Sequence, residues 1–144
     1  MPPSALAPFH PTVAAWFRDV LGKPTRAQAL GWPPIARGES TLLLAPTGSG
    51  KTLAAFLVAI DRLIGTPPPA KRGRTTVLYV SPLKALAIDV ERNLAAPIAG
   101  IQAYASRSGL AVRIPTLDVR TGDTPAKDRA RMARAPADIL ITTP

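Results

Sequence analysis

The chain has 144 residues, of which 47% are hydrophobic, and this composition suits one compact domain with its own core. It contains no cysteine, which excludes disulfide bonds and thiolate zinc sites, and it has neither a signal-peptide pattern nor an apolar run near the roughly 20 residues of a membrane span. Lys and Arg outnumber Asp and Glu by 18 to 9, giving a net charge of +9. We expect a soluble, cytoplasmic domain that binds nucleic acid, with a merely cationic surface as the alternative.

The first half of the chain predicts two helices, a strand and a further helix. Residues 11–21 carry apolar side chains at helical spacing, and a short second helix is expected over 25–32. An apolar strand over 41–45 leads into a glycine-rich segment, and an amphipathic helix follows over 50–64.

The second half continues to alternate strands with helices. The predicted elements are a loop over 66–74, a strand over 75–80, a helix over 83–109 with a possible bend at Pro97, a strand over 111–119, a basic helix over 125–134 and a strand over 138–143. Strands that are apolar on both faces and alternate with helices predict an α/β domain with a parallel sheet covered on two sides. Ligands of such sheets bind beyond the carboxyl ends of the strands.

Residues 45–52 spell Ala-Pro-Thr-Gly-Ser-Gly-Lys-Thr, a P-loop with alanine in place of its first glycine. Residues without a Cβ let the main chain curl until successive N–H groups point at a polyphosphate. Lys51 is expected to reach the β- and γ-phosphates and the Thr52 hydroxyl to hold Mg²⁺, so these two are the catalytic candidates. The alternative is a glycine-rich turn, but the flanking strand and helix favour nucleotide binding. The predicted nucleotide contacts are Ala45, Pro46, Thr47, Gly48, Ser49, Gly50, Lys51 and Thr52.

Three further motifs follow predicted strands: Ser-Pro-Leu-Lys-Ala-Leu at 81–86, Arg-Thr-Gly-Asp-Thr at 120–124 and Thr-Thr-Pro at 142–144. Small hydroxyl residues, glycine and a lysine at strand-to-helix turns can hold a phosphate without reading a base. A plain turn explains each motif equally well when it is taken alone, and Ser81 could simply be a helix N-cap.

Together these motifs resemble the first motor lobe of superfamily 2 helicases, and most closely its large-helicase-related (Lhr-like) branch. The resemblance covers nearly the whole chain and implies a RecA-like, three-layer P-loop fold that uses ATP and Mg²⁺. It also implies nucleic-acid contacts, with DNA favoured over RNA because 81–86 and 120–125 are closer to this branch than to DEAD-box RNA helicases. The implied contacts are Ser81, Pro82, Lys84, Arg120, Thr121, Gly122, Thr142 and Thr143.

The resemblance assigns residues 1–40 to a helical region with a Q motif and residues 41–144 to the P-loop core. In the Q motif, Thr25 and Gln28 are expected at the adenine, since a glutamine amide can both donate to and accept from its edge. The aromatic that stacks on the base could be Phe9, Trp16 or Phe17, although the last two are expected in the core.

Motors of this kind hold the Mg²⁺ shell with an acidic residue after a later strand. No acid occupies that position here, because Asp138 precedes its strand and Asp118 and Asp123 belong to an earlier one. We therefore expect the N-terminal part of an ATP-dependent, repair-related helicase that binds nucleotide weakly and hydrolyses almost none. The alternative is a non-catalytic nucleotide- or nucleic-acid-binding module. The single histidine, His10, is expected to be structural, and the basic helix over 125–134 a solvated face.

Overall fold

The computed structural model describes residues 4–67 and 74–144. Within these ranges the chain forms α1 (Pro11–Val20), α2 (Arg26–Ala36), α3 (Lys51–Gly65), β1 (Val77–Val80), α4 (Lys84–Arg107), β2 (Leu117–Arg120), α5 (Ala126–Arg134) and β3 (Ile139–Thr142). The loop predicted over 66–74 falls mostly outside the described residues. No helix within them combines the length and the hydrophobicity that crossing a bilayer takes.

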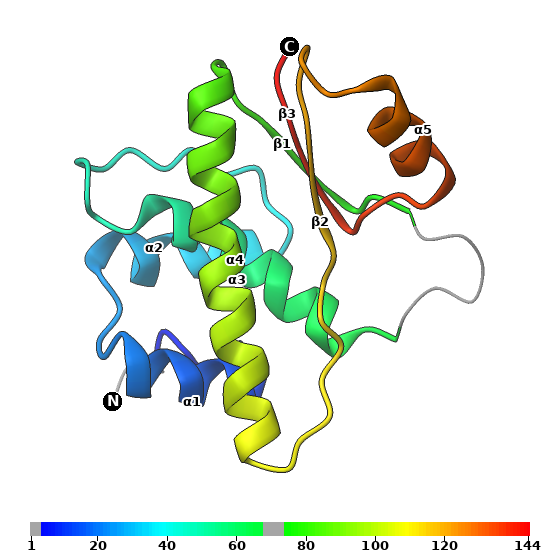
Figure 1. The fold of residues 1–144 in the computed structure, drawn as a ribbon. Helices are drawn as coiled ribbons and strands as arrows, with labels where there is room; N and C mark the ends of the chain where they lie inside the picture. The colour runs from blue at the N-terminus through cyan, green and yellow to red at the C-terminus, as the bar shows by residue number, and fades with distance from the viewer. Residues whose placement is uncertain (1–3, 68–73) are drawn as a thin grey trace.

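The three strands form one parallel sheet in the order β1-β3-β2. In the register of the sheet, Ile139 of β3 lies beside both Val77 of β1 and Leu117 of β2. The strands run in one direction, so their carboxyl ends gather with the start of α4 and the C-terminus at the top of Figure 1. This arrangement confirms the predicted α/β class with a parallel sheet.

The core lies between the sheet and helices α3 and α4. Ile139 and Ile141 of β3 are completely buried, and each such aliphatic side chain contributes about 1.5–3 kcal/mol relative to an exposed one. The helices supply the opposite wall, with Leu57 and Ile60 from α3 and Leu94 and Ile101 from α4. The P-loop helix is thereby anchored to the same core as the strands.

An aromatic cluster fixes α1 against α2. The rings of Phe9 and Phe17 meet the buried Trp32 edge-on at centroid distances of 4.9 and 5.4 Å. Trp16 packs against Gly100 of α4, where an added Cβ would lie 2.5 Å from the indole Nε1. All three aromatic candidates for adenine stacking are therefore buried, as expected for Trp16 and Phe17.

The strand predicted over 41–45 is wrong, because this segment pairs with no strand among the described residues. Leu42 and Leu44 are 83% and 84% exposed. The apolar pattern of a strand is insufficient without a neighbour to complete its hydrogen-bond ladder.

Three other elements differ from the sequence prediction. Helix α2 continues through Pro33 and Pro34, neither of which can donate a helical hydrogen bond, and the residue before them, Trp32, is completely buried. Strand β2 begins at Leu117, six residues later than predicted. On β1 the expected two-sided burial does not hold within the described chain, because Leu78 and Val80 are 61% and 53% exposed.

Candidate nucleotide and nucleic-acid sites

The P-loop is curled, as the sequence predicts. Gly48 and Gly50 both have φ of +78°, in the left-handed region that favours glycine. The Ser49 N–H donates to the Pro46 carbonyl at 3.3 Å, closing a turn immediately before α3. The main chain therefore bends back on itself over the few residues that precede the helix.

This bend leaves backbone donors available at the start of α3. Among the described residues, the N–H groups of Gly48, Gly50, Lys51 and Thr52 donate to no protein acceptor, and the first helical bond is that of Ala54 to the Gly50 carbonyl. These groups add to the positive end of the dipole of a 15-residue helix. The segment has the features of an anion site.

The two catalytic candidates lie at this helix start. The Lys51 ammonium donates to the carbonyls of Ala45 and Pro46, the latter at 2.6 Å, so the lysine folds back over its own loop. Thr52, the second residue of α3, is exposed. Both side chains are within the loop that would hold a polyphosphate.

The Q-motif residues donate side-chain hydrogen bonds to backbone carbonyls of the P-loop. Thr25 and Gln28 form a reciprocal capping box at the start of α2, with the Gln28 Oε1 accepting from the Thr25 N–H at 2.9 Å. The Thr25 hydroxyl donates to the Ser49 carbonyl at 2.7 Å, and the Gln28 amide to the Gly50 carbonyl at 3.4 Å. Gln28 is only 4% exposed. Thr25 and Gln28, expected at the adenine from the sequence, thus also connect α2 to the P-loop, a link that the sequence pattern does not indicate.

A cleft of about 850 Å³ opens beside the P-loop, between the end of α1 and the middle of α4. Its wall is mostly apolar, from Trp16, Val20, Leu21 and Leu94, with Lys51 and the glycines of the P-loop at one side. Of the described residues, no carboxylate lines it. The cleft can accept a ligand that joins an apolar part to an anionic one.

Hydrogen bonds join the three loops at the carboxyl edge of the sheet. The Ser81 N–H donates to the Thr142 carbonyl at 2.8 Å, and the Thr142 hydroxyl to the Arg120 carbonyl at 2.7 Å. Ser81 is completely buried, and its hydroxyl donates to the Leu83 carbonyl at 3.0 Å. Ser81 thus shapes its loop from inside and is not the N-cap of α4, a position that Leu83 takes.

The exposed part of this edge carries Lys84, Gly122 and Asp123. The Lys84 ammonium lies 2.6 Å from a carboxylate oxygen of Asp123, and the two side chains are 53% and 75% exposed. The same lysine passes over Gly122, whose added Cβ would lie 4.0 Å from the ammonium nitrogen. Residues of two motifs, 39 positions apart in the sequence, are thereby brought together. Pro82 is exposed in the first motif, and Thr143 is half-buried just after the end of β3.

Helix α5 contributes an arginine that sequence analysis missed. The Arg129 guanidinium donates to the carbonyls of Thr121, Gly122 and Thr124 at 3.2, 2.8 and 2.8 Å. Arg131 pairs at 2.8 Å with Asp118, and this hydrogen bond raises the pKa of the guanidinium. A solvated basic face was expected, and no residue of α5 is buried, yet Arg129 faces the loop that precedes its helix.

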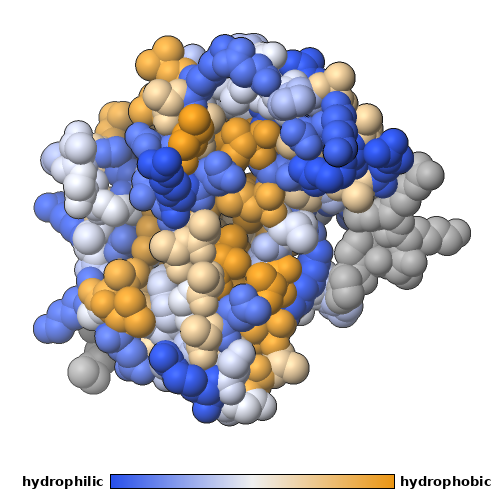
Figure 2. Space-filling model, viewed as in Figure 1, coloured by the Kyte–Doolittle hydropathy of each residue, from blue (hydrophilic) through white to orange (hydrophobic). Residues whose placement is uncertain are grey.

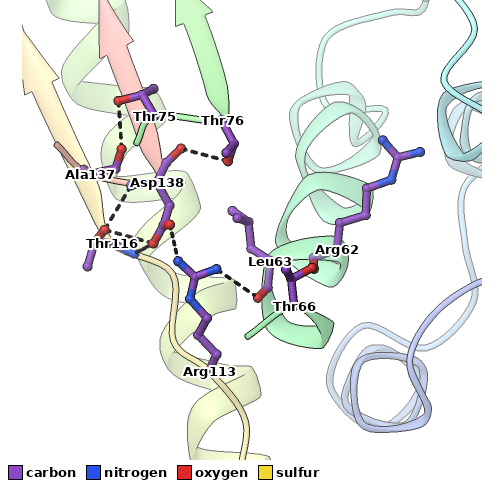
Figure 3. A network of polar contacts seen from close by, with 9 residues as sticks. All are labelled: Arg62, Leu63, Thr66, Thr75, Thr76, Arg113, Thr116, Ala137 and Asp138. Carbon is purple, nitrogen blue, oxygen red and sulfur yellow. Dashed lines mark hydrogen bonds and ion pairs between the residues drawn. The ribbon is translucent and has the colours of Figure 1, made fainter. Parts of the chain in front are cut away.

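Asp138 lies at the opposite, amino-terminal edge of the sheet, as expected from its place before β3. Its carboxylate pairs with Arg113 and accepts from the N–H and hydroxyl of Thr116 at 2.9 and 3.0 Å (Figure 3). The Arg113 guanidinium also donates to the Leu63 carbonyl of α3. This network is structural and distant from the P-loop. His10 is structural too, since its Nδ1 accepts the Thr12 N–H at the start of α1.

Comparison with known proteins extends these observations. The chain is 53% identical over 139 residues to the Lhr helicase/probable uracil glycosylase of Mycolicibacterium smegmatis, and 47% identical over 149 residues to the Lhr helicase/uracil glycosylase of Escherichia coli. These alignments cover 96% and 99% of the chain but only 9% and 10% of the relatives, so the chain spans about a tenth of their length. A solved structure of the Mycobacterium smegmatis helicase Lhr bound to ssDNA and AMP-PNP superposes with a TM-score of 0.89 at 52% identity, over 98% of this chain and 18% of that one.

The sequence profile of the DEAD/DEAH box helicases matches residues 25–144, which begin at the capping box of α2 and include the P-loop and all three strand-end loops. The chain belongs to the DEAD/DEAH box helicase family.

Proposed function

We propose that this chain forms the ATP-binding and strand-binding part of an Lhr-type ATP-dependent helicase, in its first RecA-like lobe. Residues 1–40 supply the Q-motif region and residues 41–144 the P-loop core. The observation that carries the proposal is the curled loop with two left-handed glycines and unpaired N–H groups at the start of α3. Because the chain spans about a tenth of its curated relatives, unwinding and translocation are proposed for the whole protein.

For the nucleotide, the P-loop amides and Lys51 hold the phosphates. The hydroxyl of Thr52 is exposed at the same helix end and fits one position in the shell of a Mg²⁺ ion, which keeps several waters and phosphate oxygens as its other ligands. When bound, the ion neutralises charge on the phosphates. Thr25 and Gln28 contribute by holding the loop carbonyls of Ser49 and Gly50 away from the ligand.

For nucleic acid, the loops at the carboxyl edge contact the sugar-phosphate backbone of a single strand. Lys84 and Gly122 are exposed and Thr143 is half-buried, and Ser81 and Thr142 hold the loops in place. DNA is favoured because a relative 52% identical in sequence was solved with ssDNA. A role in repair remains a prediction from the family resemblance alone.

A nucleotide-binding assay tests the proposal directly. Titration of the chain with a fluorescent ATP analogue should show saturable binding that Lys51→Ala weakens at least about tenfold, since it removes the cation at the phosphates. Lys127→Ala is the matched control, because it removes an equal charge from α5 and should leave nucleotide affinity unchanged. Equal affinity in the Lys51→Ala protein would exclude the P-loop as the binding site.

The alternative is a binding module without catalysis. It shares one expectation with the helicase proposal, because no carboxylate of the described chain lines the cleft beside the P-loop. We therefore expect phosphate release by this chain to stay near background with or without single-stranded DNA. Robust DNA-stimulated turnover that disappears in Lys51→Ala would show that the chain is catalytic by itself.

A further inference from the structure

Helix α5 contacts the loop over 120–124. Burial of side chains does not explain this contact, since no residue of α5 is buried. This helix instead lies at the upper right of Figure 1, and hydrophilic residues gather over the same region in Figure 2. Arg129 is partly buried, and its guanidinium turns toward the loop. The contact between helix and loop is therefore polar and specific.

The guanidinium uses its planar fork of donors on three carbonyls of one short loop. The loop closes further on itself, since the Thr121 N–H donates to the Thr124 hydroxyl at 2.8 Å and the Thr124 N–H to the Thr121 carbonyl at 3.2 Å. Carbonyl oxygens that would repel an approaching anion are thus engaged by the guanidinium of Arg129.

What remains on the outside of this loop suits a phosphate. In the described part of the chain the Gly122 N–H donates to no protein acceptor, and Gly122 is exposed. The Lys84 ammonium lies close to the same glycine, where the Asp123 carboxylate at 2.6 Å marks an anion position. A phosphate that takes the place of this carboxylate would meet one lysine and one backbone donor.

We propose that Arg129 is a positioning residue for nucleic-acid binding: it holds the loop over 120–124 so that Gly122 and Lys84 together receive one backbone phosphate diester. The inference rests on the proposed nucleic-acid function and adds to it a residue outside the strand-end motifs. Arg129 itself does not touch the strand. Its effect depends on the forked geometry of the guanidinium and not only on its charge.

The test compares Arg129→Lys and Arg129→Gln with the wild-type chain. Arg129→Lys keeps the charge but presents its donors from a single nitrogen in place of the two guanidinium nitrogens that contact the loop. It should therefore weaken binding of a labelled 20-nucleotide oligo-dT by roughly tenfold, much as Arg129→Gln does. Arg134→Lys and Arg134→Gln, on the same helix, are the matched controls and should bind within about twofold of wild type. Circular dichroism checks that every variant keeps its helices.

Two further measurements separate positioning from direct contact. Without nucleic acid, amide exchange of Thr121 and Thr124 should accelerate in both Arg129 variants and in neither control. The log–log salt slope of binding should fall by the same amount, about 0.7, in Arg129→Lys and Arg129→Gln, because both variants lose the one phosphate contact that the positioned loop makes with Lys84.

Three outcomes overturn the inference. Wild-type affinity in Arg129→Lys would mean that charge alone matters. A salt slope that falls by about 0.7 in Arg129→Gln but keeps its wild-type value in Arg129→Lys would make Arg129 a direct phosphate ligand. Unchanged amide exchange would mean that Arg129 does not hold the loop. If the wild-type chain binds no oligonucleotide while the exchange responds as expected, the proposed nucleic-acid function fails and Arg129 only maintains the loop.

Discussion

Gly50 is the residue at which the P-loop, helix α3 and the Q-motif residues meet. Its φ of +78° places it in the left-handed region, and a Cβ there would lie 2.4 Å from the Gln28 amide nitrogen. Gly48 has the same φ but open space around the position of a Cβ. Both glycines therefore allow the left-handed backbone of the loop, and only Gly50 also leaves space for the side chain of Gln28.

This difference gives a prediction. Gly48→Ala should cost about 1–2 kcal/mol, the strain of a left-handed alanine, whereas Gly50→Ala should cost roughly 1 kcal/mol more because Gln28 must leave its capping box. Urea unfolding measures both. In a Gln28→Ala background the additional cost of Gly50→Ala should vanish, and additive effects in this double-mutant cycle would contradict the explanation.

Asp61 on α3 is a second residue with a measurable effect. Burial raises its pKa, and the His10 N–H that it accepts at 2.7 Å only partly opposes this shift. A carboxyl whose folded-state pKa exceeds the unfolded value destabilises the fold while ionised, and the penalty disappears as pH falls through the folded-state pKa.

We accordingly expect Asp61→Asn, which keeps an acceptor for His10, to be more stable than wild type at pH 7. The difference in unfolding free energy should shrink as the pH is lowered toward the usual range of aspartate, near 4. Thermal unfolding across pH 4–8 measures this trend. A stability difference that grows on acidification would have the wrong sign for a raised pKa.

At the scale of the elements, Asp138 and Arg113 join the starts of β2 and β3 to the end of α3 (Figure 3). The pair is well buried, with 9% and 16% of the two side chains exposed. The pair of Asp118 and Arg131 joins β2 to α5, and its arginine is 51% exposed. The same type of ion pair thus occurs in two environments.

Asp138→Ala should destabilise the chain by about 3–5 kcal/mol, since it leaves a buried guanidinium without its counter-ion. The Asp118 side chain is itself 14% exposed, but Asp118→Ala should cost less than about 1 kcal/mol because the arginine that it leaves behind is accessible to water. Chemical denaturation of the two variants compares them directly. Similar small losses in both would show that the Asp138 network is dispensable.

The elements also show what the sequence could predict. Helices with clear periodicity, such as α3, and the glycine-rich loop are predictable because their signals are local. The strand predicted over 41–45 fails because strand formation depends on a partner elsewhere in the chain. The connections made by Gln28 and Arg129 were missed because a hydrogen bond from a side chain to a distant carbonyl leaves no periodic pattern in the sequence.

At the scale of the molecule, apolar surface remains accessible on β1 and on the segment before the P-loop. Leu42, Leu44, Leu78 and Val80 are all more than half exposed. In the described sheet, β1 is an edge strand, and an exposed apolar edge promotes association between chains. The net charge of +9 opposes such association through repulsion.

We therefore expect the isolated chain to self-associate with increasing concentration, and more strongly at 0.5 M than at 0.05 M salt, because salt screens the repulsion. Light scattering measures this. The double variant Leu78→Lys/Val80→Lys should remain monomeric. Leu30→Lys is the control, because Leu30 is also exposed but lies on α2, away from the edge strand, and this variant should associate as wild type does. Association that is insensitive to the β1 substitutions would place the contact elsewhere.

The parallel alignment of β1, β3 and β2 has a mechanical consequence. A pull on the loop at the carboxyl end of one strand, while the neighbouring strands are held, is directed along the strand axes. It therefore loads the hydrogen bonds between neighbouring strands in shear. Hydrogen bonds loaded in shear must break together, whereas a pull perpendicular to the strands breaks them one at a time. Tension from a polymer that moves across the carboxyl edge of the sheet would therefore act along the strands, the direction in which this small sheet resists force best.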